Sequence, residues 1–217
     1  MLEKAHDRQL DPPQPDPVRK DRRTLRREAT KAEILEAAWD LVREHGLAAL
    51  ALRDLAERVG MRAPSLYQYF PSKHAIYDAM FGQGTQAALE SVAAPVDTSD
   101  PREALGEIAR RMFEFSTSDP ARMQLLFQRT IPGFEPTPEA YAPAIEMHAQ
   151  VAGLLVSLGI SDPDAMDLWT ALISGLVNQQ LANDPGGDRW GRLVDRTVDM
   201  FLAYVGTAPS AAKKKGK

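Results

Sequence analysis

Two glycines and two prolines divide the N-terminal third of the chain, and their spacing limits the folds that it can adopt. Gly46 follows a stretch of apolar residues with helical spacing, and Gly60 follows a second, shorter stretch. Pro64 suits the first turn of a third helix, which must end before Pro71 because a residue that precedes proline disfavours helical backbone angles. The sequence therefore predicts one long helix followed by two short ones around a glycine turn.

Apolar residues keep helical spacing along the rest of the chain, and the alternation typical of strands is missing. This pattern predicts an all-α fold with about nine helices. The expected helices cover residues 24–45, 52–59, 64–70, 73–92, 101–117, 120–130, 138–158, 163–183 and 188–205.

Proline content and apolar periodicity divide the 217 residues into two domains with a tail at each end. Residues 1–22 contain four prolines and almost no apolar periodicity, so we expect a disordered arm there. A small helical domain is expected over residues 23–72 and a larger one over residues 73–206. Residues 207–217, which end in KKKGK, have the composition of a disordered tail.

The two domains differ in charge, although the whole chain carries a net charge of only −4. Residues 19–73 hold 12 lysines and arginines against 8 acids, whereas residues 101–206 hold 8 arginines, no lysine and 14 acids. A basic front is typical of proteins that bind a polyanion, although solvated charge runs are also common. The charge pattern therefore favours different partners for the two domains.

Several classes of function lack their usual sequence signals. The chain contains no cysteine, which excludes disulfides and zinc–thiolate sites and fits a reducing cytoplasm. Its four histidines are scattered, and no phosphate-binding loop, dinucleotide fingerprint or nucleophile elbow occurs. No signal peptide or membrane-spanning apolar run is present, so we expect a cytoplasmic protein with no membrane partner, metal or cofactor. An enzyme would need a site assembled from residues far apart in the sequence.

Two short helices joined around a glycine are typical of the helix-turn-helix, whose second helix enters the major groove of DNA. At about 100° per residue, Leu66 and Phe70 share one side of the third helix, while Pro64, Ser65 and Gln68 point away from it. Gln68 can offer a paired donor and acceptor to adenine, Ser65 can bond several bases, and Pro64 can contact a thymine methyl. Pro64, Ser65 and Gln68 are therefore the expected base-reading residues.

A second group of side chains borders this outward face and can reach the phosphates of DNA through hydroxyl and cationic groups. The expected DNA-backbone residues are Arg62, Tyr67, Tyr69, Lys73 and, on the first helix, Thr30 and Lys31. The competing interpretation is that the two tyrosines are half-buried packing residues. The basic run RKDRRTLRREATK, residues 19–31, is a further candidate, either as an arm in an adjacent minor groove or as a solvated run.

The segment from Thr30 to Phe81 resembles the DNA-binding domain of the tetracycline-repressor (TetR) family of bacterial transcription regulators. The matching residues are Ile34-Leu35, Ala37-Ala38, Leu55-Ala56, Gly60, Leu66-Tyr67, Tyr69-Phe70 and Ser72-Lys73. The resemblance implies phosphate contacts by Tyr67, Tyr69 and Lys73, and base reading by the outward face of the third helix. It also implies a homodimer that places two recognition helices on a palindromic operator in double-stranded DNA.

The chain departs from the family pattern at two places. Ala51 stands where members often carry a serine or threonine that caps the second helix, and the missing cap costs about 1 kcal/mol. Met61 and Arg62 stand where a small hydroxyl residue is common. Arg62 can replace the missing phosphate contact with a charge, whereas Ala51 is not an expected contact.

The acidic region after Pro95 resembles the ligand-binding and dimerisation half of the family more weakly. Its last two helices carry apolar stripes wide enough to pack on their own subunit and on a second one, which predicts a two-fold four-helix interface. The expected interface residues are Leu172, Leu176, Trp190, Leu193, Val194 and Phe201. The run from Trp169 to Gly175 also resembles the tryptophan-histidine-glycine pattern of one family branch, with Ser174 in place of the histidine.

A ligand pocket is expected among the middle helices, where methionines and aromatic residues supply adaptable apolar surface with a few polar groups. The expected lining residues are Met112, Phe113, Met123, Phe127, Tyr141, Met147, His148 and Trp169. Plain core packing is the alternative for each of them, and the sequence does not identify the ligand.

The sequence thus predicts a TetR-like regulator, in the simplest case a repressor that leaves its palindromic operator when a small molecule binds. The alternative is an effector-independent dimeric DNA-binding factor whose rear domain serves only dimerisation. A partly polar cavity in the rear domain would favour the ligand-responsive regulator, whereas a solid core would favour the alternative. Clustered titratable residues around such a cavity would favour an enzyme.

Overall fold

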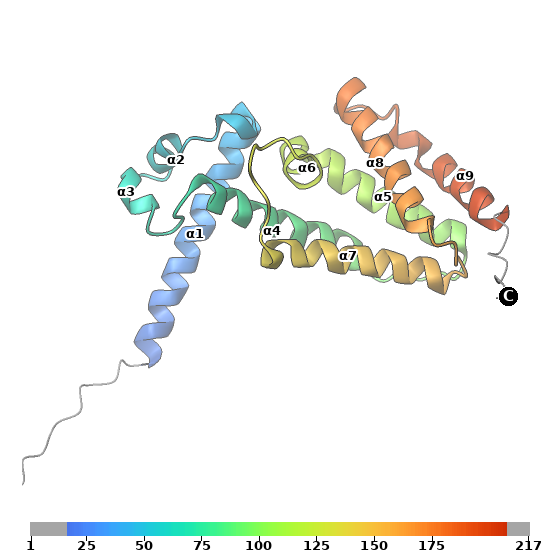
Figure 1. Ribbon diagram of the computed structural model, residues 1–217, viewed down its shortest axis with the longest axis horizontal. Coiled ribbons are helices and arrows are strands. Elements are labelled where there is room, and N and C mark those ends of the chain that lie inside the picture. The colour runs from blue at the N-terminus through green and yellow to red at the C-terminus, as the bar shows by residue number, and fades with distance from the viewer. Residues whose placement is uncertain (1–16, 208–217) are drawn as a thin grey trace, which may run out of the picture.

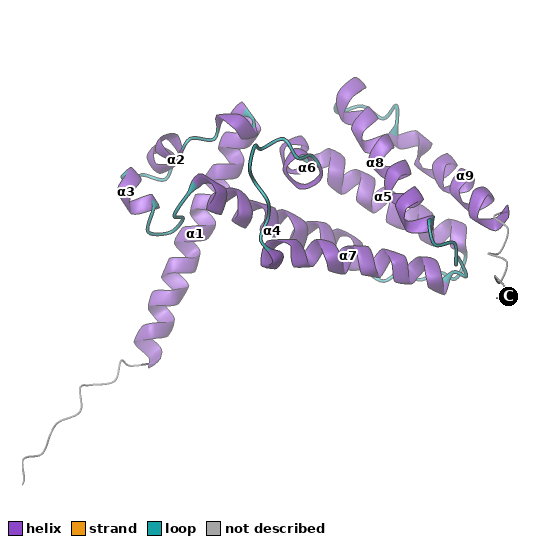
Figure 2. Ribbon diagram, in the orientation of Figure 1, coloured by secondary structure: helices purple, strands orange, loops and turns teal. Residues whose placement is uncertain are grey.

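The computed structural model describes the backbone of residues 17–207 and the side chains of residues 21–206. Helices follow one another through this part of the chain, which contains no strand (Figures 1 and 2). The helices are α1 (Pro17–His45), α2 (Leu52–Arg58), α3 (Ala63–Leu66), α4 (Lys73–Ala93), α5 (Pro101–Ser118), α6 (Pro120–Phe127), α7 (Pro138–Ser157), α8 (Ala165–Asn183) and α9 (Val194–Thr207), with two 3₁₀ turns, η1 (Leu47–Ala49) and η2 (Gly191–Leu193). The expected all-α fold is confirmed.

The two ends of the chain are described only in part. α1 begins at Pro17, so residues 17–22, which we expected in a disordered arm, are helical. Proline is favourable in the first turn of a helix, and the lysines and arginines that follow are good helix formers. The basic run RKDRRTLRREATK is therefore part of a helix and not an arm. The rest of the expected arm, residues 1–16, and residues 208–217 of the expected tail lie outside the described residues.

The recognition segment is shorter as a helix than the sequence predicted. Regular helix covers only Ala63–Leu66, and the chain continues to Phe70 as a hydrogen-bonded turn. The N–H groups of Tyr69 and Phe70 both donate to the carbonyl of Leu66, at 2.9 and 3.0 Å. Pro71 ends this segment because it cannot donate a further backbone hydrogen bond.

The first four helices enclose one apolar core. Ile34, Leu55, Leu66 and Ile76, one from each of these helices, are almost completely buried in it. Phe70 joins the same core from the turn after α3. The inward face predicted for the recognition segment is thus buried, which leaves its other side chains directed away from the scaffold.

A second core lies between α5, α8 and α9, at the far end of the molecule from α3 (Figure 1). The rings of Trp169 and Phe201 meet edge to face in it, with centroids 5.4 Å apart. Alongside, α7 lies against α4, and Gly82 of α4 faces the backbone of Ala140 in α7. The Thr85 hydroxyl lies 2.9 Å from the carbonyl oxygen of Ala140, so α4 and α7 are also joined by a buried polar contact.

Several polar contacts connect the front domain, α4 and the helices behind them. The buried Tyr77 hydroxyl of α4 donates to the carbonyl of Leu47 in η1, with an oxygen–oxygen distance of 2.5 Å. Arg43 of α1 donates to the Asp119 carboxylate from two guanidinium nitrogens, at 2.9 and 3.0 Å. Asp78 of α4 accepts hydrogen bonds from the backbone N–H and hydroxyl of Thr137, the residue that caps α7.

We predict that Tyr77→Phe lowers the free energy of unfolding by ~1 kcal/mol, because the buried Leu47 carbonyl loses its best donor. The effect stays modest because the N–H of Leu50 still donates weakly to the same oxygen, at 3.4 Å. Burial raises the pKa of Tyr77 to about 12, so the folded state holds its phenol proton after the unfolded chain has lost it.

The unchanged protein should therefore have the higher free energy of unfolding. Its difference from Tyr77→Phe should be full below pH 10 and should shrink as the pH rises towards 12. Urea unfolding at several pH values measures this difference. The control is Tyr67→Phe, which removes a hydroxyl from a ring that is 51% exposed. Equal destabilisation of the two variants would contradict a structural role for the Tyr77 hydroxyl.

Candidate DNA-binding surface and ligand cavity

The recognition segment is positioned by a glycine turn and a packed inner face. Gly60 adopts φ of +66°, a conformation that side chains with a Cβ rarely take, and it turns the chain from α2 into α3. Leu66 and Phe70 then hold the segment to the core. Two short helices are thereby fixed at a sharp turn, which is the arrangement of a helix-turn-helix.

The expected base-reading residues lie on one outer surface of this segment. Pro64 and Gln68 are exposed and Ser65 is half-buried. The Gln68 side chain makes no hydrogen bond to any described residue, so its amide is available to a partner. The backbone oxygen of Gln68, in contrast, is already bound by Arg27.

Both recognition-segment tyrosines border this surface, but to different degrees. Tyr67 is about half exposed, whereas Tyr69 is half-buried against the front core. The Arg27 guanidinium lies over the ring of Tyr69, 5.0 Å from its centroid, and also donates to the Gln68 oxygen at 2.6 Å. Arg27 thus clamps the recognition segment to α1, a role that sequence reasoning missed because only a contact between distant segments reveals it.

Lys73 lies at the start of α4, where Ser72 caps the helix by accepting a hydrogen bond from the N–H of Ala75 at 3.1 Å. The Lys73 ammonium donates to the carbonyl of Ala48 at 3.2 Å and lies 5.4 Å from the centre of the Tyr77 ring. An ammonium has three N–H donors, so this arrangement fixes the charge at the edge of the recognition surface and leaves donors for an anion.

The other expected backbone contacts are more dispersed. Arg62 is exposed and immediately precedes α3. Thr30 and Lys31 lie on α1, where each already has a partner on the same helix. The Thr30 hydroxyl lies 3.0 Å from the Arg26 carbonyl oxygen, and the Lys31 ammonium lies 3.2 Å from the Glu28 carboxylate.

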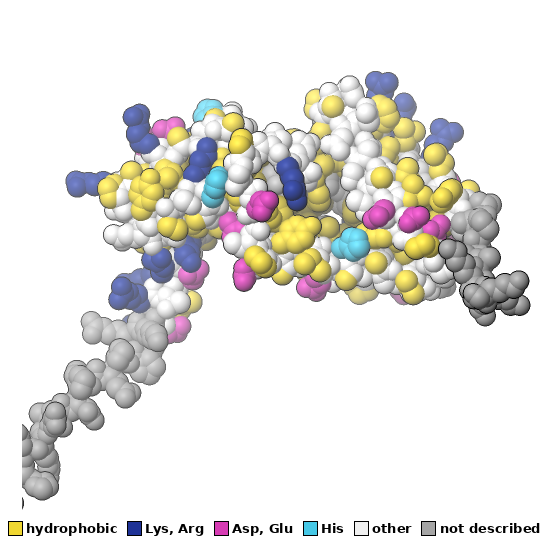
Figure 3. Space-filling view, viewed as in Figure 1, with side chains coloured by type: hydrophobic (Ala, Val, Ile, Leu, Met, Phe, Trp, Pro, Cys, Tyr) yellow, Lys and Arg dark blue, Asp and Glu magenta, His cyan; other side chains and the backbone are white. Residues whose placement is uncertain are grey.

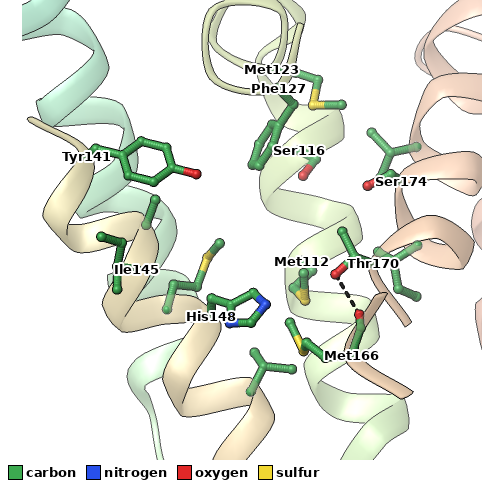
Figure 4. A pocket seen from close by; sticks show the side chains of 15 residues that line it. Met112, Ser116, Met123, Phe127, Tyr141, Ile145, His148, Met166, Thr170 and Ser174 are labelled. Carbon is green, nitrogen blue, oxygen red and sulfur yellow. Dashed lines mark hydrogen bonds between the residues drawn. The ribbon is translucent and has the colours of Figure 1, made fainter. Parts of the chain in front are cut away.

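A cavity of about 330 Å³ lies in the rear domain between α5, α6, α7 and α8 (Figure 4). Its wall consists of Met112, Ser116, Met123, Phe127, Tyr141, Ala144, Ile145, Met147, His148, Val151, Met166, Thr170, Ile173, Ser174 and Val177. Tyr141 and His148 point into it from α7, and Thr170 lies opposite, with its hydroxyl bonded to the carbonyl of Met166 (Figure 4). Sequence reasoning missed the lining residues of α8, which are Met166, Thr170, Ile173, Ser174 and Val177, because their role depends on how α8 packs.

Two of the residues that we expected in this wall lie elsewhere. Trp169 is 1% exposed and belongs to the second core, where it packs on Phe201. Phe113 points towards η2, since a Cβ on Gly191 would lie 3.0 Å from its ring. Both are apolar residues on helices that line the cavity, but on faces turned towards α9.

The cavity wall is mostly apolar and carries a few polar groups. Four methionines contribute flexible, polarisable side chains. No aspartate, glutamate, lysine or arginine is among the described residues of the wall, and its polar groups are hydroxyls and one imidazole. Such a wall can hold an uncharged, mainly apolar molecule, whereas a charged one would lose its hydration without an ionic partner.

The expected dimer-interface residues do not share one exposed face. Val194 and Phe201 are 3% and 1% exposed because they fill the core between α5, α8 and α9, so a second subunit cannot contact them. Leu172 and Leu176 are half-buried against the same core, and Leu193 is half-buried in η2. The outer surface of α9 instead presents a large exposed apolar residue that sequence reasoning missed, Met200.

Comparison with known proteins agrees with these features. A family model described as "Bacterial regulatory proteins, tetR family" matches residues 34–80, which include α2 and α3. The class A tetracycline repressor from transposon 1721 of Escherichia coli is 27% identical over 194 residues, which cover 84% of each chain. The chain belongs to the TetR family. The HTH-type regulator RutR of Escherichia coli is 31% identical over 105 residues, which cover about half of each chain.

Solved structures of TetR-family regulators and of related proteins share the fold. The crystal structure of the regulatory protein SCO4313 superposes with a TM-score of 0.71 at 20% identity, covering 83% of this chain and 98% of that one. A single-residue variant of TetR from Acinetobacter baumannii AYE, solved in complex with minocycline, gives a TM-score of 0.54 at 22% identity over 81% of this chain and 96% of that one.

Family membership gives the front domain its general role. This TetR-family chain is a DNA-binding transcription regulator, and the relatives that it matches are regulators and not enzymes. Among the described residues, no group of histidine and acidic side chains could hold a metal ion. Within the same residues, no helix has the length and hydropathy needed to span a bilayer.

The missing cap of α2 yields a test of how the recognition segment is held. Ala51 occupies the N-cap position with extended backbone angles and makes no side-chain cap bond. We predict that Ala51→Ser raises the free energy of unfolding by ~1 kcal/mol, because the hydroxyl can accept from a free N–H of the first turn. The matched change Ser72→Ala, which removes a cap that is present, should lower it by a similar amount. Urea unfolding measures the free energy of unfolding of both variants. A lower value for Ala51→Ser than for the unchanged protein would contradict the prediction.

Proposed function

We propose that this regulator is a homodimeric repressor that leaves a palindromic DNA operator when an uncharged, mainly apolar small molecule fills the rear cavity. The observation that carries the proposal is the 330 Å³ cavity, because a domain used only for dimerisation needs no such space. The effector-independent factor is therefore the less supported alternative. The wall also lacks the clustered acids and bases that an enzyme would need.

On DNA, we assign base reading to Pro64, Ser65 and Gln68 and phosphate contacts to the groups around them. The exposed amide of Gln68 supports this assignment, as does the position of Lys73 at the edge of the same surface. The remaining proposed backbone contacts are Arg62, Tyr67, Tyr69, Thr30 and Lys31. Thr30 and Lys31 would have to exchange their present partners for phosphate oxygens.

For dimerisation, we propose the outer surfaces of α8 and α9. Leu172 and Leu176 are partly exposed on α8, and Met200 on α9 is 65% exposed. A second copy related by a two-fold axis would cover the same residues on both subunits, which gives a four-helix interface. Trp190 and Leu193 are half-buried at the edge of this region, whereas Val194 and Phe201 support it from the core.

The cavity reaches the front domain through α6. Met123 and Phe127 of α6 line the cavity, and Asp119 caps the same helix by accepting from the N–H of Arg122 at 3.1 Å. Asp119 also binds Arg43 of α1. A ligand that displaces Met123 or Phe127 would therefore shift a short helix whose other end holds α1.

A second route runs through aromatic rings. Tyr141, in the cavity wall, stacks on Phe81 of α4 with centroids 6.0 Å apart. Phe81 contacts Phe134, which in turn contacts Tyr77 at 5.9 Å. Tyr77 binds Leu47 of the front domain. Movement of Tyr141 would thus alter the angle of α4, so that two recognition helices no longer match major grooves about 34–36 Å apart.

For the DNA contacts, we predict that Gln68→Ala relaxes base preference at one operator position by about 1–3 kcal/mol, because it removes a paired hydrogen bond. Lys73→Ala should weaken binding to all sequences alike. It should also lower the slope of log affinity against log salt concentration by about one, because one ammonium–phosphate interaction is removed. Operator selection from random DNA, followed by binding titrations at several salt concentrations, measures both effects. The same reduction of sequence preference in both variants would contradict the assigned roles.

For ligand control, we predict that Ser174→Phe blocks effector binding but keeps operator binding, because the new ring fills the cavity. Thermal unfolding with fragments of matched size in neutral, anionic and cationic forms measures binding. Neutral aromatic fragments should stabilise the unchanged protein, by about 2.7 kcal/mol at one hundred times the dissociation constant, and should release fluorescent operator DNA.

The control variant for this test is Ser157→Phe, at an exposed position near the end of α7 outside the cavity. It should respond to the fragments like the unchanged protein. Stabilisation that survives in Ser174→Phe would place the binding site elsewhere. Binding without release of DNA would support the effector-independent alternative.

A further inference from the structure

The N-terminal part of α1 extends beyond the front core as an exposed helix (Figure 1). Every residue from Asp21 to Ala29 is exposed, and the first buried residue of the helix is Ile34. We call residues 21–29 the overhang. Apolar packing within the front domain does not involve this extension, so its charged side chains are its distinctive feature.

The charges of the overhang are sorted onto two sides. With Arg22 set at 0° and about 100° per residue, Arg26 lies at about 40°, Arg23 at about 100° and Arg27 at about 140°. The two acids of the overhang, Asp21 and Glu28, lie at about 260° and 240°, on the opposite side. Figure 3 shows lysine and arginine side chains gathered on this part of the molecule.

The basic side of the overhang is tied to the recognition segment. Arg27 lies at one edge of the arginine sector. It donates to the backbone carbonyl oxygen of Gln68 at 2.6 Å, and its guanidinium lies over the Tyr69 ring. The other three arginines have no ion-pair partner among the described residues, and they continue from that junction away from the domain. Arg22 lies about 7.5 Å along the helix axis from Arg27.

We infer that the overhang is a second DNA-binding element, which lies along the phosphates that flank the operator half-site. Its occupant is duplex DNA because a row of unpaired arginines beside the recognition segment complements a polyanion that continues past the half-site. The inference rests on the proposed placement of α3 on DNA. It adds affinity without sequence information, since phosphate contacts do not distinguish bases.

The test uses two duplexes that carry an operator selected from random DNA by the protein itself. One duplex is trimmed to the half-sites, and the other continues for several base pairs on both sides. The unchanged protein should bind the longer duplex at least tenfold more tightly. The variant Arg22→Gln/Arg23→Gln/Arg26→Gln should lose that preference and bind both duplexes alike, because glutamine keeps the helix propensity but not the charge.

Salt dependence supplies an independent readout. Each phosphate contact contributes about 0.9 to the slope of log affinity against log salt, so the triple variant should lower the slope on the longer duplex by roughly three to five in a dimer. The matched control is Arg129→Gln/Arg189→Gln/Arg192→Gln, which removes the same charge from exposed positions of the rear domain outside α8 and α9. It should leave the duplex preference and the slope unchanged.

Distinct outcomes separate the inference from the function beneath it. Equal binding of both duplexes by the unchanged protein, or an unchanged slope in the overhang variant, overturns the inference while the regulator still binds its operator. An equal effect in the control variant also overturns it, because long-range charge would then explain the result. Failure to select any operator would overturn the proposed function itself.

Discussion

The structure depends on α4, because this one helix is built into both cores. Its first turns place Ile76, Tyr77 and Met80 in the core of the front domain, and its last turn places Val92 in the core of the rear domain. A continuous helix resists bending, so any change in how the rear domain packs around it becomes a change in its direction at the front. In the proposed mechanism, α4 therefore connects the DNA-binding surface to the cavity, although no side chain belongs to both.

Much of this architecture could be predicted from the sequence, because glycine and proline mark helix ends whatever the surroundings. Gly46, Gly60 and Pro71 set the limits of the first helices, and the helical period places Phe70 on the same side as Leu66, which is the side that is buried. The start of α1 was placed too late because apolar periodicity, which the overhang lacks, cannot report a helix that has no buried face. The helix propensity of its residues and the position of Pro17 indicate the start of α1 instead.

Residues whose role depends on the direction of a whole helix were harder to predict. Val194 and Phe201 lie on an apolar stripe that serves either a subunit interface or the core, and only the packing of α9 on α5 and α8 decides between them. Trp169 and Phe113 failed as cavity residues for the same reason. Six of the eight expected lining residues do line the cavity. Methionines and aromatic residues on several helices indicate a loosely filled space where those helices meet, whatever the exact direction of each helix.

The energies of the contacts between the front domain and the rear domain indicate which of them could transmit a change from the cavity. The side chains of Arg43 and Asp119 are 45% and 12% exposed, and an ion pair that solvent reaches on one side contributes on the order of 1 kcal/mol. Allosteric coupling between two sites is typically about 1–3 kcal/mol, so the Arg43–Asp119 pair could supply only the lower end of that range. The ring series from Tyr141 to Tyr77 offers more, because Phe81 and Tyr77 are buried and close-packed side chains shift between discrete arrangements. In the proposed ligand-controlled mechanism, the aromatic route is therefore the stronger connection between cavity and DNA, and the Arg43–Asp119 pair is a secondary link to α6.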